Sequence, residues 1–151
     1  MLCLSVLDVS EAAIRLGRER LPHAPIRWIH ADVTSDWTAA PVDLWHDRAT
    51  FHFLTACEDR RRYVDALKRT LKPGGQAVIA AFSVEGPTCC SGLPVVRYSP
   101  EALAAELGPS FRLIDAVPEL HRTPAGATQA FTYSRLAFDG PQVPAGRDHG
   151  L

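Results

Sequence analysis

The chain has 151 residues, 46% of them hydrophobic and 22% charged, with a formal net charge of -1. This length suits one globular domain, and the charge balance gives no reason to expect a nucleic-acid or membrane partner. No apolar run approaches the roughly 20 residues that span a bilayer, and residues 1–7 lack the features of a signal peptide. We therefore expect a cytoplasmic protein. Its four cysteines lack the spacing of a metal or disulfide framework, which indicates reduced thiols and no metal site.

The chain begins with an apolar run over residues 4–7, which predicts a short strand ending at Asp8. Ser10 stands where a helix N-cap belongs, and Glu11 in the first turn suits the helix dipole. The pattern predicts a helix to about residue 21, where proline stops it.

Two further strands are predicted over residues 26–30 and 42–46, followed by Asp32 and Asp47. Thr55 and Glu58 match a capping box at the start of a helix.

The second half of the chain contains a helix stop, further strands and a helix start. The Pro-Gly-Gly of residues 73–75 is expected to end the preceding helix, and the apolar run 77–82 predicts a strand covered on both faces. A helix is predicted from Ser99-Pro100-Glu101 to Gly108-Pro109. Residues 111–117 and 129–138 are expected to pair as antiparallel strands, and residues 83–98 form the longest predicted loop.

Acidic residues follow three successive predicted strands, at Asp8, Asp32 and Asp47. Ligands bind beyond the carboxyl ends of strands in an open α/β sheet. A carboxylate accepts two hydrogen bonds, as the paired hydroxyls of a ribose require. Each aspartate could instead be an ordinary turn residue, but the ordered set favours a nucleoside-binding site.

Four stretches resemble successive motifs of class I S-adenosylmethionine-dependent methyltransferases. They are Val6-Leu7-Asp8-Val9-Ser10, Ala31-Asp32-Val33, Val42-Asp43-Leu44-Trp45-His46-Asp47 and Leu71-Lys72-Pro73-Gly74-Gly75. The resemblance covers residues 4–138. It implies S-adenosylmethionine as cofactor, with Asp8 on the ribose hydroxyls and Asp32 on the adenine amine. The implied cofactor-binding set is Asp8, Val9, Asp32, Val33 and Asp47.

The resemblance also places the methyl group and the substrate near His46, Asp47 and Arg48. His46 and His52 are candidate bases because histidine titrates near neutral pH. The predicted catalytic residues are therefore His46, Asp47 and His52, although His52 between two phenylalanines also suits a core position. With no basic surface, a small-molecule acceptor is expected.

The family's first strand and glycine-rich turn have no counterpart before Asp8, since none of the seven preceding residues is glycine. We expect an α/β fold: a Rossmann-like, mostly parallel sheet with helices on both faces and an antiparallel C-terminal strand pair, missing its first strand. Residues 1–138 would form this truncated domain and residues 139–151 a flexible C-terminal tail.

The missing strand would lie between those ending at Asp8 and His46, leaving edges open to oligomerisation. The expected activity is methyl transfer, impaired in this form. A displaced start codon or gene fragment would explain the truncation. A non-catalytic remnant that acts as an interaction module is the alternative, and a nicotinamide-binding domain is a third interpretation. An upstream in-frame strand with Gly-x-Gly would favour the enzyme.

Overall fold

A computed structural model describes residues 3–142 of the chain. Its elements are, in chain order, β1 (Leu4–Asp8), α1 (Glu11–Arg20), β2 (Ile26–His30), β3 (Val42–Arg48), the 3-10 turn η1 (Phe51–Phe53), α2 (Cys57–Thr70), β4 (Leu71–Phe82), β5 (Cys89–Cys90), β6 (Leu93–Pro94), α3 (Pro100–Leu107), β7 (Phe111–Arg122) and β8 (Thr128–Phe138). None of the helices within residues 3–142 has the length and apolar character needed to cross a membrane.

The amino-terminal unit consists of β1, α1 and β2, as the sequence predicts. Ser10 caps α1 through its side-chain oxygen, and β1 pairs with β2 in parallel. Helix α1 covers one face of this pair, because a Cβ atom on Gly17 would lie only 2.5 Å from Cη2 of Trp28. Ile29 is the next residue of β2, so its side chain lies on the opposite face, where it packs against the main core.

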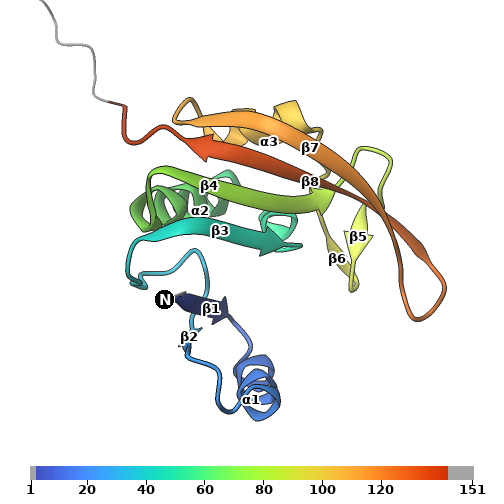
Figure 1. Ribbon diagram of the computed structural model, residues 1–151. Helices are drawn as coiled ribbons and strands as arrows, with labels where there is room; N and C mark the ends of the chain where they lie inside the picture. Colours follow the sequence, from blue (N-terminus) through green and yellow to red (C-terminus); the bar gives the residue numbers. More distant parts are fainter. Residues whose placement is uncertain (1–2, 143–151) are drawn as a thin grey trace, which may run out of the picture.

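A second sheet holds four strands in the order β3-β4-β8-β7 (Figure 1). Strands β3 and β4 are parallel, whereas β8 pairs antiparallel with both β4 and β7. The predicted C-terminal antiparallel pair is confirmed, and β7 runs five residues beyond its predicted end. The prediction of a mostly parallel sheet is wrong for the described residues. Parallel pairing is confined to β1–β2 and β3–β4, while the long hairpin contributes two antiparallel pairings.

The main core lies between this sheet and helices α2 and α3. Both helices contribute buried residues to one cluster with the same face of β4, among them Tyr63, Leu67, Leu103, Ala77 and Ile79. The helices therefore lie on both faces as expected, with α1 on one side and α2 and α3 on the other. The opposite face of the four-stranded sheet carries exposed side chains such as Leu44 and Val117.

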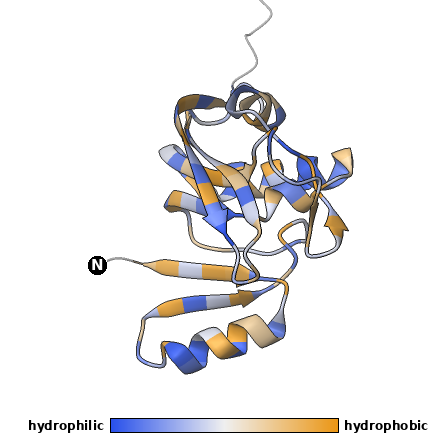
Figure 2. Ribbon diagram, turned by 90° about the vertical axis from the view of Figure 1, so that its right-hand side faces the viewer, coloured by the Kyte–Doolittle hydropathy of each residue, from blue (hydrophilic) through white to orange (hydrophobic). Residues whose placement is uncertain are grey.

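The sheet is interrupted between β1 and β3. Among residues 3–142, β1 pairs only with β2, and β3 pairs only with β4, so their facing edges carry no ladder hydrogen bonds. Figures 1 and 2 both place β1, rather than β2, on the side toward the four-stranded sheet. Figure 2 also shows that β1 is largely hydrophobic, as its sequence LSVLD indicates.

Helix α2 begins differently from the prediction. Its N-cap is Ala56, which has no side-chain cap, so the capping box of Thr55 and Glu58 is wrong. Glu58 instead accepts hydrogen bonds from Arg61 and Arg62 on the following turn. These local ion pairs compete for the carboxylate that a capping box would direct back toward the backbone.

The end of α2 leads directly into β4, because the helix stops at Thr70 and the strand begins at Leu71. The Pro-Gly-Gly segment forms a bulge inside β4, where the pairing with β3 jumps from Leu71 to Gln76. Gly74 has φ 83°, and a Cβ on Gly75 would lie 3.0 Å from the Asp43 carbonyl oxygen. Gly74 therefore permits the left-handed backbone of the bulge, and Gly75 permits the close approach of β3. The two glycines shape the bulge in β4, in addition to following the end of the helix.

The predicted Ser99 cap and Gly108 stop of α3 are both confirmed. The predicted loop 83–98 contains the small β5–β6 hairpin. Asp139, the first residue of the expected C-terminal tail, forms an ion pair with Arg112. Residues 143–151 of that expected tail lie outside the described residues.

Candidate functional site

The predicted site residues lie at the carboxyl ends of parallel strands. Asp8 ends β1, Asp32 follows β2 by two residues, and His46 lies near the end of β3. Because β1 and β2 are adjacent and parallel, Asp8 and Asp32 share one edge of the pair. His30 links these strand ends, since its Nε2 lies 3.1 Å from the Val9 carbonyl oxygen. Sequence reasoning missed His30, and only its place at the end of a strand could have indicated it.

Asp8 retains an oxygen that can bind a ligand. Its Oδ1 accepts a hydrogen bond from the backbone N–H of Ser10 at 2.7 Å, which orients the carboxylate. The described residues offer no partner to Oδ2. The neighbouring Val9 is 67% exposed, so an apolar side chain lies uncovered beside the acid. The Asp8 carboxylate could accept hydrogen bonds from the hydroxyls of a nucleoside, and the Val9 side chain could pack against its ring.

Asp32 is oriented in a similar way. Its Oδ1 accepts hydrogen bonds from the backbone N–H and the hydroxyl of Thr34, each at 2.7 Å. These bonds lower the pKa of the Asp32 carboxyl below its ordinary value. Oδ2 has no partner within residues 3–142 and can accept a hydrogen bond from an exocyclic amine. Val33 is only 8% exposed and packs into the core.

Asp47 lies on the opposite face of β3 from His46. It is 6% exposed and accepts three hydrogen bonds, from the Thr50 and Phe51 backbone and from the Tyr63 hydroxyl at 2.6 Å. Burial raises the pKa of its carboxyl, and the three bonds partly offset that rise. Both oxygens are thus occupied by internal partners that fix the turn after β3.

His52 is fully buried and is surrounded by aromatic rings. Its Nδ1 accepts a hydrogen bond from the Phe82 backbone, so the neutral ring is protonated at Nε2. Burial lowers the pKa of His52 to about 4. The structure therefore places Asp47 and His52 in the core and His46 at the surface, and only His46 of these three enters the site proposed below.

Arg48 ends β3 on the same face as His46. Its Nε donates to the Tyr133 hydroxyl at 2.9 Å, and Glu119 lies 3.8 Å from its Nη2. Tyr133 and Glu119 belong to the C-terminal hairpin, 85 and 71 residues later in the chain. No local signal in the sequence could have identified these partners.

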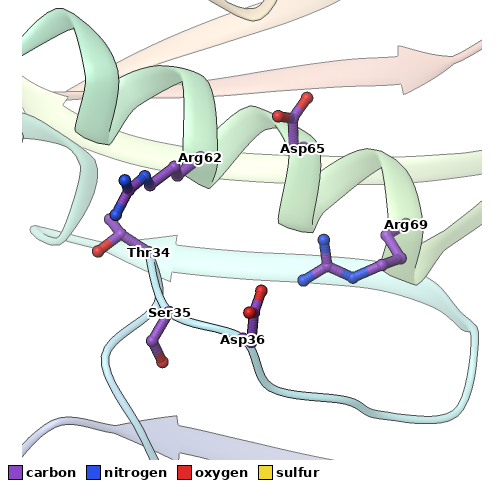
Figure 3. A pocket seen from close by; sticks show the side chains of 6 residues that line it. All are labelled: Thr34, Ser35, Asp36, Arg62, Asp65 and Arg69. Atoms are coloured by element: carbon purple, nitrogen blue, oxygen red, sulfur yellow. The ribbon is translucent and has the colours of Figure 1, made fainter.

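A separate groove of about 480 Å³ lies between the segment after β2 and the outer side of α2 (Figure 3). Its lining residues are Thr34, Ser35, Asp36, Arg62, Asp65 and Arg69. Its walls are polar and carry opposite charges, and none of Asp8, Asp32 and His46 lines it. The groove therefore lies beside the strand-end site, and Thr34 connects the two by donating hydrogen bonds to the Asp32 carboxylate.

The fold resembles several solved methyltransferases. N-methyltransferase NodS from Bradyrhizobium japonicum, determined with S-adenosyl-L-homocysteine, matches with a TM-score of 0.71 and 20% identity over 90% of this chain and 66% of that chain. The 1,6-didemethyltoxoflavin-N1-methyltransferase of Burkholderia thailandensis, with bound 1,6-didemethyltoxoflavin and S-adenosylhomocysteine, matches with a TM-score of 0.68 and 17% identity. That match covers 89% of this chain and 60% of the other. At these identities the likeness shows the fold.

Sequence comparison identifies the family. An uncharacterized methyltransferase of Mycobacterium tuberculosis is 30% identical over 80 residues, which is 52% of this chain and 39% of the relative. The chain thus spans about two fifths of the curated relatives that it matches. Residues 4–79, half of the chain, match the family model described as "Methyltransferase domain". The resemblance seen in the sequence motifs is confirmed: this chain belongs to the methyltransferase domain family.

Proposed function

We propose that this chain forms the adenosine-binding and acceptor-facing part of an S-adenosylmethionine-dependent methyltransferase that acts on a small molecule. The observation that carries the proposal is the pair of oriented carboxylates, Asp8 and Asp32, at one edge of two adjacent parallel strands. In each, one oxygen accepts a hydrogen bond from a neighbouring backbone N–H, and the other has no partner within residues 3–142. This arrangement fits a ribose and an adenine amine side by side.

The cofactor supplies an activated methyl group on a sulfonium, which lowers the demands on the protein. The acceptor's lone pair forms a bond to the methyl carbon as the carbon–sulfur bond breaks, and its electrons pass to sulfur. The protein must hold nucleophile, carbon and sulfur in line. If the acceptor is protonated, its proton must also leave, and we propose that His46, which is exposed near the end of β3, takes it.

The interruption between β1 and β3 supports a second part of the proposal, that the complete enzyme has one more strand there. A parallel strand in that position would satisfy both open edges. In the family this strand leads into the glycine-rich turn beside the cofactor, so we propose that the chain of 151 residues alone binds cofactor weakly.

Calorimetric titration with S-adenosylhomocysteine tests both parts of the proposal. We expect little heat from the 151-residue chain and saturable binding by a chain extended upstream. A panel of small amines, phenols and carboxylic acids with radiolabelled S-adenosylmethionine then tests transfer. No heat of binding by the extended chain would refute the cofactor assignment.

A non-catalytic interaction module is the second candidate, and the same open edges favour it. Here a strand from another chain would fill the interruption. Saturable binding of the cofactor product by the extended chain would exclude this alternative, whereas a stable complex with a strand-donating partner and no cofactor binding would support it.

A further inference from the structure

Arg48 lies across the sheet rather than along its edge. It stands opposite Ala80 of β4, which in turn stands opposite Tyr133 of β8. The small side chain of Ala80 leaves room for the guanidinium group to pass over β4 and reach the hairpin. The long side chain is therefore directed over the sheet face that α2 and α3 leave uncovered.

Three contacts orient this guanidinium group. Nε donates to the Tyr133 hydroxyl at 2.9 Å, and the guanidinium carbon lies 4.9 Å from the centre of the Phe131 ring. Glu119 lies 3.8 Å from Nη2, which is too long for a hydrogen bond. An arginine held by one nitrogen and an aromatic face is pre-organised to bind through its remaining nitrogens.

Those remaining nitrogens are available. Among the described residues, neither Nη1 nor Nη2 of Arg48 donates a hydrogen bond, and its side chain is 40% exposed. Arg135 on the same sheet face is different, because it donates two bonds to Asp115 at 3.0 and 2.8 Å. Arg135 is internally satisfied. Within residues 3–142, Arg48 has only the long charge contact with Glu119 at its Nη atoms, and it lies at the carboxyl end of a parallel strand.

The backbone next to Arg48 is also unusual. Ala49 has φ 66°, a left-handed conformation that is costly for a residue with a Cβ atom. Its N–H bonds to the Ala80 carbonyl oxygen at 2.9 Å, so the surrounding structure holds it in place. Such strain concentrates at functional sites. Here it turns the chain out of β3 immediately after Arg48.

We propose that Arg48 binds a carboxylate on the methyl acceptor and so determines which small molecules the enzyme accepts. This rests on the proposed function, which places the transferred methyl group near the end of β3. A guanidinium group binds a carboxylate through two parallel N–H bonds. A single arginine beside Glu119 suits a monoanion better than a doubly charged phosphate, because the neighbouring carboxylate repels a second negative charge.

The test measures binding of benzoate and of benzamide to the 151-residue chain by NMR titration. Arg48→Gln is compared with Arg135→Gln, which removes the same charge from the same sheet face. We expect Arg48→Gln to weaken benzoate binding about tenfold or more, as the loss of a charge-assisted bond implies. Arg135→Gln should leave benzoate binding unchanged, and benzamide should bind weakly to all three proteins.

Glu119→Gln provides a second arm that does not depend on the folding of Arg48→Gln. Glu119 is 44% exposed and competes with an external carboxylate for Arg48. Its replacement should therefore tighten benzoate binding by about threefold. Unchanged or weaker binding would overturn the proposal, because a purely structural arginine has no reason to gain affinity when a neighbouring acid is removed.

Further outcomes would also overturn the assignment. Tighter binding of inorganic phosphate than of benzoate would contradict the carboxylate specificity. If Arg48→Gln in the extended chain weakens S-adenosylhomocysteine but not methylthioadenosine, Arg48 binds the cofactor's own carboxylate instead. Failure of the proposed function would give a different result: S-adenosylhomocysteine would not bind to the extended chain, whereas benzoate would still bind.

Discussion

Replacing Tyr63 by Phe removes a single oxygen atom from the centre of the core. Tyr63 is fully buried, and its hydroxyl donates to Asp47 at 2.6 Å while accepting from the Trp45 indole N–H at 3.0 Å. Phenylalanine retains the ring and its packing against Phe51, whose centre lies 4.8 Å away. The substitution therefore tests the hydrogen-bond network almost without creating a cavity.

The expected loss of stability is about 3 kcal/mol. A hydrogen bond to an ionised carboxylate contributes ~1.5–3 kcal/mol, and leaving a buried donor unpaired costs ~1–3 kcal/mol. The lower part of the second range applies because Trp45 is only partly buried. For a domain of this size, such a loss lowers the melting temperature by about 10 °C.

The matched control is Tyr98→Phe. Tyr98 is also buried, but its hydroxyl has no hydrogen-bond partner among the described residues, and burial raises its pKa to about 12. Its removal should leave stability unchanged or raise it by up to ~1 kcal/mol. Urea unfolding followed by circular dichroism measures both variants. Equal losses in the two would refute the reasoning, since they would show that the hydrogen bonds of Tyr63 contribute nothing specific.

Three other predictions concern pH, packing and association. Because the folded-state pKa of His52 is about 4 against an ordinary 6.5, the stability it confers is complete above pH 6.5 and is lost as pH falls toward 4. His52→Asn keeps a hydrogen-bond acceptor but cannot be protonated, so the free energy of unfolding should fall less between pH 6.5 and pH 4 than in the unmodified protein. The raised pKa of Asp47 acts in the opposite direction in both proteins, because its protonation on acidification favours the folded state. Gly17→Ala gains ~1 kcal/mol of helix propensity, but its Cβ would meet the Trp28 ring and overpacking costs ~1–3 kcal/mol, so we expect a net loss of up to ~2 kcal/mol in thermal unfolding. A gain of the full ~1 kcal/mol would contradict the packing described. The open edges of β1 and β3 should make the 151-residue chain self-associate, and a monodisperse monomer in analytical ultracentrifugation would count against them.

Local patterns in the sequence predicted the elements well. The apolar run before Asp8, the Ser10 and Ser99 caps and the final strand pair all appear in the structure. These features depend on residues that are neighbours in the chain, so their physical cause is visible in the sequence. The capping box at Thr55 failed because nearby arginines offered Glu58 better partners.

Long-range contacts could not be predicted in the same way. The sequence marks Asp47 as one more acid at a strand end, but the face it occupies depends on the pleat of β3 and on Tyr63 of α2. Its burial only becomes evident once helix and sheet pack together. Likewise, Arg48 meets Tyr133 because β8 inserts beside β4, an arrangement that no local pattern specifies.

The most direct test of the account is the affinity of the upstream-extended chain for S-adenosylhomocysteine, measured by calorimetry with and without Asp8→Asn. Asp43→Asn serves as the control, because Asp43 is an exposed acid on β3 that pairs with Lys72. We predict that Asp8→Asn weakens binding about tenfold or more, as loss of a charge-assisted bond to the ribose requires, and that Asp43→Asn has no effect. Equal affinity for all three proteins would contradict the assignment of the strand-end acids to the cofactor.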